Sequence, residues 1–233
     1  MTSSLRQTLA LVAAIAASFA VFALWPGLDL WVTGRFHDPL QRFSAADAGW
    51  PNMGRMAVWR ASQALLLVSF VALAYGLLRR QDALGVPARV WGYVLGLYLI
   101  GPGLLVDVVL KPVWGRARPA NVLEFGGTLD FTPPTQIADQ CARNCSFVSG
   151  EVAGAVALAI SLLLILAHLR DRLGRWTYRI ARAIVLFLPI FIAWQRIAAG
   201  RHFLSDAVFA TLFTLLVAVV LYAAINPKGW KAG

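Results

Sequence analysis

The residues SFVSGEVAGAVALAISLLLILAHL (146–169) contain one carboxylate, Glu151, which stands at the start of a long apolar run. A helix needs about 20 mainly apolar residues to cross the hydrocarbon core of a bilayer. The run that follows Glu151 continues to about Leu169 and meets this length. We therefore expect a membrane-spanning helix here, with an acidic side chain near one surface of the membrane.

The composition of the whole chain agrees with a bilayer as its solvent. Of the 233 residues, 59% are hydrophobic and only 14% are charged, and the mean hydropathy is +0.68. A soluble domain is less apolar than this. Six stretches are long and apolar enough to span: about 7–25, 58–78, 90–110, 147–168, 180–198 and 204–224. They predict an all-α integral membrane six-helix bundle that forms one domain, residues 1–233.

The first stretch follows Arg6 and could be read as a signal peptide. It is long, lacks a clear A-x-A cleavage site, and is followed by five more apolar stretches. We interpret it as an uncleaved anchor.

The basic residues of alternate loops set the expected orientation. They are Arg79, Arg80 and Arg89 after the second span, Arg170, Arg172, Arg175, Arg179 and Arg182 after the fourth, and Lys228 and Lys231 after the sixth. Positive loops stay on the cytoplasmic side, so both termini are expected there. Segments 26–57, 111–146 and 196–203 then face outward, the first as a lid-like segment. This topology accounts for much of the net charge of +10, so no nucleic-acid partner is expected.

Two outward segments carry cations that the charge rule does not explain: Lys111, Arg116, Arg118, Arg143, Arg196, Arg201 and His202. Each set lies next to an apolar helix, so the side chains would gather near one membrane surface. Lys and Arg together suit phosphate oxygens. The alternative is contact with lipid headgroups or surface ion pairs, which is the reading we favour for Arg116 and Arg201.

His202 and Asp206 are four residues apart and would share one face of a helix. A carboxylate on one ring nitrogen fixes the tautomer and leaves the other nitrogen free to act as a nucleophile or base. An ordinary contact at a helix start is the alternative. Asp107 precedes Lys111 by the same spacing, and it either neutralises Lys111 or holds it in position.

Cys141 and Cys145 are the only cysteines in the chain, and both fall in the outward segment 111–146. In an oxidising compartment they could form a disulfide, or they could remain two separate thiols. A zinc site made of both cysteines, His202 and Asp206 is a rival reading. The surrounding cations would repel a dication, and C-x3-C departs from the usual C-x2-C spacing.

Three sets of residues together resemble a known signature. Lys111-x6-Arg118-Pro119, Ser149-Gly150 and Arg196-x5-His202-x3-Asp206 are similar to the three motifs of the type 2 phosphatidic acid phosphatase superfamily. The resemblance implies a phosphatase with six spans and its active site on the non-cytoplasmic side. It implies neither a metal nor another cofactor.

The resemblance also implies a role for each matching residue. His202 would be the nucleophile that forms a phosphohistidine, and Asp206 would orient it. The phosphoryl oxygens would be held by Lys111, Arg118, Ser149, Gly150 and Arg196.

Glu151 stands where the family's second motif, Pro-Ser-Gly-His, has the His that protonates the leaving group, and Val148 replaces the Pro. A general acid must carry a proton, which burial favours and neighbouring cations oppose. Glu151 could be that acid, an ion-pair partner that organises the Arg and His side chains, or an anion that is favoured at a helix N-terminus. We expect one of the two roles in the pocket.

The stretches IGPGLLVDVVLKPVWGRARP, EFGG and QCARNCSFVSGE resemble more closely the subgroup that removes the 4′-phosphate of lipid A at the outer face of the inner membrane. The sequence thus predicts a metal-independent lipid phosphatase of the inner membrane, with a site that faces the periplasm. Undecaprenyl pyrophosphate and phosphatidylglycerophosphate are alternative substrates. A non-catalytic lipid-binding or transport bundle and a phosphotransferase are alternative functions, and no oligomeric state is predicted.

Overall fold

A computed structural model describes residues 3–43 and 48–225, and these residues contain helices but no named strand. The long helices are α1 (Ser3–Leu24), α3 (Gly49–Arg79), α4 (Ala88–Tyr98) with its continuation η2 (Leu99–Leu110), α6 (Gly150–His168), α7 (Arg175–Ala198) and α8 (Leu204–Ile225). Within residues 3–43 and 48–225, six helical segments are long and apolar enough to cross a membrane. The predicted all-α, six-span class is confirmed.

Helix α3 differs most from its prediction, because it begins at Gly49 rather than near residue 58. Its first two turns include Pro51, Asn52 and Arg55, which lower the hydropathy without opposing a helix. Proline is tolerated in the first turn, where its missing N–H has no partner to lose. The helix therefore extends beyond the apolar run, and this extension brings Arg55 to the site described below.

The third span is not one regular helix. After α4, residues 99–110 form the π-helix η2, which contains Pro102 between two glycines, and the short helix α5 (Lys111–Trp114) follows. A proline inside a helix removes one hydrogen bond and crowds the preceding turn, and π-helical segments often occur at functional sites. Here the π-helix leads directly into Lys111.

Helix α6 lies in the interior and packs against α3, α4, η2, α7 and α8. Nearly every side chain between Val152 and Ser161 is buried, and most of them are small. Small side chains let helix backbones approach closely, which is the main source of packing between helices in a bilayer. This packing fixes the N-terminal end of α6, where Glu151 lies.

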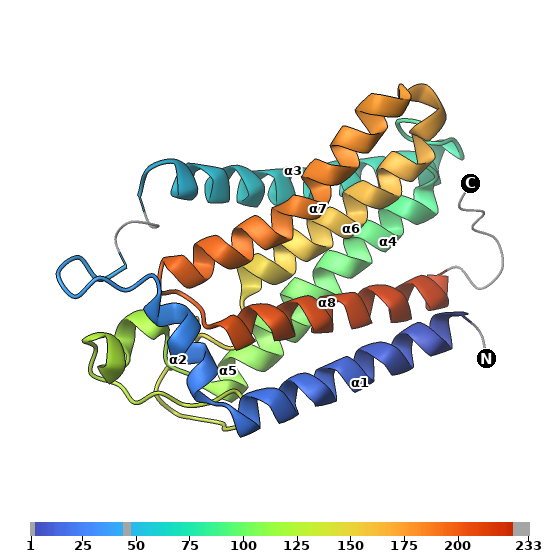
Figure 1. Cartoon of the computed structure of the whole chain (residues 1–233). Coiled ribbons are helices and arrows are strands. Elements are labelled where there is room, and N and C mark those ends of the chain that lie inside the picture. The colour runs from blue at the N-terminus through green and yellow to red at the C-terminus, as the bar shows by residue number, and fades with distance from the viewer. Residues whose placement is uncertain (1–2, 44–47, 226–233) are drawn as a thin grey trace.

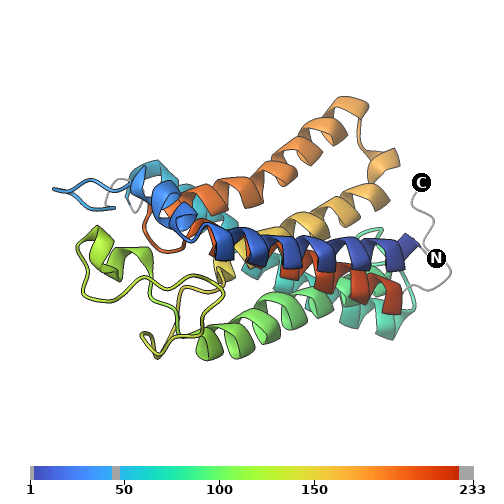
Figure 2. The same cartoon turned by 60° about the horizontal axis from the view of Figure 1, so that its bottom comes forward.

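The two ends of the bundle differ (Figures 1 and 2). One end carries the start of α1, the end of α8 and the α3–α4 and α6–α7 connections. The other end carries the short helices α2 (Gly27–Gly34) and α5, together with the long loop that follows α5. The basic α3–α4 and α6–α7 connections thus share an end, as the charge pattern requires. Lys228 and Lys231 lie outside the described residues. Which end faces the cytoplasm stays a prediction.

The segment 26–57, which the sequence suggested as a lid, contains α2 and the first turns of α3. The side chains of Asp29 and Thr33 in α2 are fully buried. Further along, Phe43 packs on Gly200, where an added β-carbon would lie 2.3 Å from the Phe43 ring. The α2 part of this segment is therefore anchored to the bundle, and a lid function stays a prediction.

Candidate functional site

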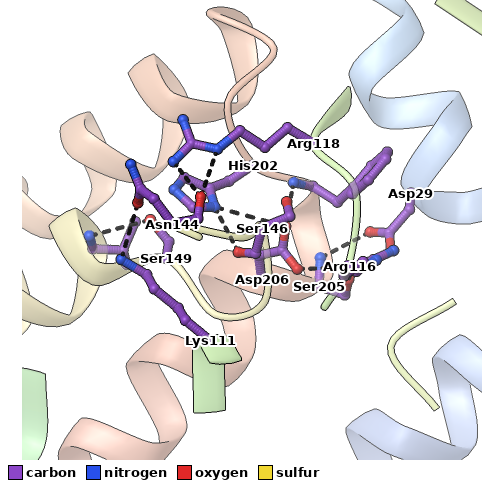
Figure 3. Close-up of polar contacts among 12 residues, drawn as sticks. Asp29, Lys111, Arg116, Arg118, Asn144, Ser146, Ser149, His202, Ser205 and Asp206 are labelled. Atoms are coloured by element: carbon purple, nitrogen blue, oxygen red, sulfur yellow. Dashed lines mark hydrogen bonds and ion pairs between the residues drawn. The ribbon is translucent and has the colours of Figure 1, made fainter. Parts of the chain in front are cut away.

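His202 lies in the turn between α7 and α8, at the end of the bundle that carries α2 and α5 (Figure 3). The main-chain carbonyl of Arg196 accepts hydrogen bonds from the N–H groups of Arg201 and His202, at 3.0 and 3.2 Å. Gly200 permits this turn with a φ of +63°, a conformation that residues with a β-carbon rarely adopt. The spacing between Arg196 and His202 thus reflects one compact helix-to-helix turn.

The imidazole of His202 is only 4% exposed. Its Nδ1 lies 2.8 Å from the main-chain carbonyl oxygen of Ser146 and 3.8 Å from Oδ2 of Asp206. A carbonyl can only accept, so Nδ1 carries the hydrogen and Nε2 is left with its lone pair. The family resemblance implies that Asp206 orients this ring. In the structure the shortest contact of Nδ1 is with the Ser146 carbonyl, and Asp206 binds the hydroxyl group of the same serine.

The surroundings of His202 favour its neutral form. Burial lowers the pKa of the imidazole below its ordinary value, and the charges of Arg118 and Lys111 lower it further, while Asp206 opposes them. A neutral imidazole with Nδ1 protonated has its lone pair on Nε2. The ring is therefore in the form that a nucleophile requires.

Asp206 is fully buried in the first turn of α8. Its Oδ2 accepts hydrogen bonds from the Ser146 hydroxyl at 2.5 Å and from the Phe203 N–H at 2.8 Å. Its Oδ1 lies 2.7 Å from Nη1 of Arg116. The contact with Phe203 caps the helix, because it satisfies an N–H that has no intrahelical partner.

Arg116 is the clearest correction to the sequence analysis, which favoured a contact with headgroups or a surface ion pair. Its side chain is fully buried and bridges two carboxylates, Asp206 and Asp29 of α2. A cation that is followed by a loop gives no local sign of such burial. The available signal was Asp29 itself, an acid among the apolar residues of GLDLWV, which needs a partner when it is buried.

Lys111 and Arg118 both contact Asn144, a residue that the sequence analysis did not single out. Nε and Nη2 of Arg118 donate to the main-chain carbonyl of Asn144 at 3.1 and 2.8 Å, and Lys111 Nζ lies 3.5 Å from the Asn144 side-chain oxygen. Lys111 also forms an ion pair with Asp107 at 2.7 Å. This contact agrees with both readings of Asp107, as a group that neutralises Lys111 and as one that holds it in position.

A disulfide joins Cys141 and Cys145, whose Cα atoms lie 5.5 Å apart. Asn144 lies inside the small loop that this bond closes, with a positive φ of 52°. The disulfide therefore constrains the carbonyl that Arg118 contacts. It also occupies both sulfur atoms of the rival zinc reading, and among the described residues no group of three or more His, Cys, Asp or Glu side chains is arranged to hold a metal ion.

Ser149 and Gly150 form the N-terminus of α6. The Ser149 hydroxyl accepts from the Val152 N–H at 3.4 Å and caps the helix. A β-carbon at Gly150 would lie 2.8 Å from Lys111 Nζ and 3.1 Å from an oxygen of Asp107. Glycine thus lets the ammonium group approach the helix N-terminus, where backbone N–H groups favour an anion.

Glu151 lies between two guanidinium groups. Its carboxylate is 3.2 Å from Nη1 of Arg55 and 3.1 Å from Nη1 of Arg196. Nε of Arg196 also donates to the side-chain oxygen of Gln195 at 2.7 Å. Arg55 was not predicted as a site residue, because it belongs to the turns of α3 that precede the apolar run.

A pocket of about 930 Å³ opens beside these residues. Its apolar walls include side chains of α3 and η2, such as Trp59, Leu66 and Leu99. Its polar lining includes Asp107, Lys111, Asn144, Gly150 and Glu151. One cavity therefore joins the walls of two membrane-spanning segments to Lys111, one of the predicted phosphate-binding cations.

Residues 89–230 match the family model described as the PAP2 superfamily. The chain belongs to this superfamily, as the motifs predicted.

Three characterised relatives, each named lipid A 4′-phosphatase, are similar to this chain. The protein of Rhizobium etli is 33% identical over 220 residues, which are 89% of this chain and 82% of the relative. Those of Rhizobium leguminosarum and Francisella tularensis subsp. novicida are 43% and 36% identical over 129 residues, or 55% of this chain. These shorter alignments span 52% and 55% of the relatives' own lengths. No solved structure matches the chain.

Proposed function

We propose that this protein is an integral-membrane lipid phosphatase that removes a phosphate monoester through a phosphohistidine on His202. The observation that carries the proposal is the geometry of His202: a buried imidazole whose Nδ1 lies 2.8 Å from the Ser146 carbonyl oxygen, which leaves Nε2 as the nitrogen that attacks phosphorus. Membership of the PAP2 superfamily and the names of the three relatives support the same reaction.

The proposed reaction has two steps. Nε2 of His202 attacks phosphorus, the bond from phosphorus to the lipid oxygen breaks, and that oxygen takes a proton from solvent water as the lipid alcohol leaves. Water then attacks the phosphohistidine and releases inorganic phosphate. In both steps Lys111, Arg118, Arg196 and the N–H groups near Ser149 and Gly150 hold the phosphoryl oxygens and stabilise the transition state. No metal takes part in this proposal.

For Glu151 we propose the organising role. Its two ion pairs hold Arg196, and through it one side of the phosphate pocket, against α3. The contacts of this carboxylate are with two guanidinium donors, which suits an anchor better than a proton donor. The alternative role, a general acid, predicts a different response of lipid and aryl phosphate substrates to Glu151→Gln.

The proposed substrate is a phosphorylated membrane lipid, and lipid A with its 4′-phosphate is the first choice. The shape of the pocket supports a lipid, because its apolar walls come from spanning segments and its polar lining holds Lys111. The names of the relatives support lipid A. We place the site on the periplasmic face of the inner membrane, following the distribution of basic loops.

The test is a panel of three lipids given in parallel to purified protein in detergent: lipid A, phosphatidylglycerophosphate and undecaprenyl pyrophosphate. We expect release of inorganic phosphate that is fastest from lipid A and unaffected by EDTA. Faster release from another lipid would correct the substrate, and lipid binding without release from any of them would favour a non-catalytic bundle. Strong inhibition by EDTA that added metal reverses would contradict the metal-free mechanism.

A further inference from the structure

A continuous line of buried contacts runs from α2 to the candidate nucleophile (Figure 3). Oδ2 of Asp29 lies 2.9 Å from Nη2 of Arg116, and Nη1 of Arg116 lies 2.7 Å from Oδ1 of Asp206. The three side chains have no exposed surface. Asp206 in turn lies 3.8 Å from His202. Asp29 is thus three contacts from the imidazole.

Ser205 makes a second link between Asp29 and α8. The Ser205 N–H and hydroxyl donate to the two oxygens of Asp29, at 2.8 and 2.5 Å, and the hydroxyl accepts from Arg116 at 2.8 Å. Asp29 therefore also binds the Ser205 N–H, which has no intrahelical partner because it lies in the first turn of α8, next to Asp206.

The contacts of Asp29 are those of a carboxylate. Burial and the charge of Asp206 raise the pKa of its carboxyl group above the ordinary value, while Arg116 and Ser205 oppose this effect. Both oxygens nevertheless receive only donors, two from Ser205 and one from Arg116. This set of contacts is the one that an ionised carboxylate accepts.

Arg116 is too constrained to bind substrate itself. Its Nε donates to the carbonyl of Thr132 at 2.7 Å, and its guanidinium lies 4.3 Å from the centre of the Phe203 ring and 5.5 Å from that of Phe131. All three of its nitrogens are engaged by protein groups. Any influence of Arg116 on the reaction must therefore pass through Asp206.

The charges in this line stabilise the positive charge that the His202 ring gains during the proposed reaction. Two carboxylates share one guanidinium, so Asp29, Arg116 and Asp206 together carry one negative charge. Without the charge of Asp29, the positive charge of Arg116 would balance the negative charge of Asp206. When Nε2 of His202 bonds to phosphorus, its ring becomes positively charged, and a nearby negative charge is worth most in a buried site.

We propose that Asp29 is a positioning residue for His202: acting through Arg116 and Asp206, it holds the start of α8 and preserves the negative charge that faces the imidazole. This role rests on the proposed phosphatase function. In this proposal α2 supports the reaction through Asp29, although α2 lies outside the three motifs of the family signature.

The test compares Asp29→Asn with Asp38→Asn, which changes an exposed aspartate of the same segment. Kinetics are measured with whichever lipid of the panel the unmodified protein dephosphorylates fastest. Asp29→Asn should lower kcat about tenfold or more, with KM within about twofold, because the phosphate-binding cations keep their contacts. Asp38→Asn should match the unmodified protein. An unchanged kcat in Asp29→Asn, or a loss carried mainly by KM, would overturn the proposal.

The pH profile separates this role from a purely structural one. In Asp29→Asn, Arg116 pairs with Asp206 alone, so the pKa of His202 should fall and the acid limb of kcat/KM should move to lower pH. The other charged groups that act on His202, Lys111 and Arg118, are unchanged. A variant that merely contains less folded protein would show a lower rate with an unmoved acid limb, and that result would count against the proposal.

Ser205→Ala keeps the test decisive if Asp29→Asn does not fold. It removes the hydroxyl that links Asp29 to Arg116 but leaves both ion pairs, and it should lower kcat by about threefold with KM unchanged. Full activity of folded Ser205→Ala would then overturn the inference. If the unmodified protein releases no phosphate from any lipid, the proposed function fails first, so the two failures are distinguishable.

Discussion

The guanidinium of Arg55 lies 3.2 Å from both carboxylate oxygens of Glu151, although 96 residues separate them in the chain. The contact joins the early turns of α3 to the first turn of α6. On its other side, Glu151 contacts Arg196 at the end of α7. The acid that departs from the family's second motif thus joins three helices beside the proposed phosphate pocket.

Glu151→Gln should weaken phosphate binding for every substrate. Glutamine keeps the shape and some hydrogen bonds but loses two charge-assisted contacts, so KM should rise about tenfold. The loss should be similar for a lipid and for an activated aryl phosphate, measured as kcat/KM for each. If the aryl phosphate retained full activity while the lipid lost it, Glu151 would be the general acid instead.

Arg55→Gln should lower kcat/KM about threefold to tenfold, because Glu151 then keeps only Arg196 and loses its tie to α3. Arg60→Gln is the matched control, since Arg60 is an exposed arginine of the same helix. It should leave the kinetics unchanged. Equal effects of the two substitutions would show that Arg55 acts only as a surface cation.

Arg116→Met should destabilise the protein strongly. It leaves Asp29 and Asp206 buried without their shared cation, and breaking a buried pair in this way costs about 3–5 kcal/mol. Thermal unfolding in detergent would show a lower Tm than Arg60→Met, which removes an exposed cation. A Tm within the error of the control would contradict the buried bridge.

Replacement of both Cys141 and Cys145 by Ser should impair substrate binding more than stability. The disulfide closes a short loop, so its removal should cost about 2 kcal/mol or less. Asn144 lies in that loop, and its carbonyl contacts Arg118, so KM should rise about threefold to tenfold. Kinetics of the double variant, and of the unmodified protein after reduction, should agree. Unchanged KM in both would separate the disulfide from the site.

Phosphate release should persist into mildly acidic solution. Burial lowers the pKa of His202, so the neutral nucleophile survives below about pH 6.5, the ordinary value for histidine. Activity should fall only when the pH drops through this lowered pKa. A profile of kcat/KM against pH measures it, and an acid limb centred at or above about 6.5 would contradict the buried environment.

The six spans could be predicted because hydropathy is a local property and the bilayer demands long apolar helices. The first turns of α3 were missed because polar residues can extend a helix beyond the apolar run. The motif residues could be matched to a family, and the structure brings Lys111, Arg118, His202 and Glu151 to one end of the bundle.

The contacts that support the motif residues could not be predicted in this way. Asp29 and Arg116 are 87 residues apart, and the role of each becomes clear only from its contact with the other. Ser146 and Asn144 act through main-chain carbonyls, which every residue type possesses. The identity of these two residues therefore does not signal their main-chain contacts, although the Ser146 hydroxyl and the Asn144 side-chain oxygen also contact Asp206 and Lys111.

In the proposed mechanism, His202 carries the phosphoryl group between the lipid and water. The most direct measurement gives the purified protein lipid A labelled in its 4′-phosphate, stops the reaction with base within a turnover, and follows label bound to the protein. We expect label that is stable in base, lost in acid, present in EDTA and absent from His202→Ala. Label of the same amount on His202→Ala, or phosphate release by that variant at the rate of the unmodified protein, would contradict the account.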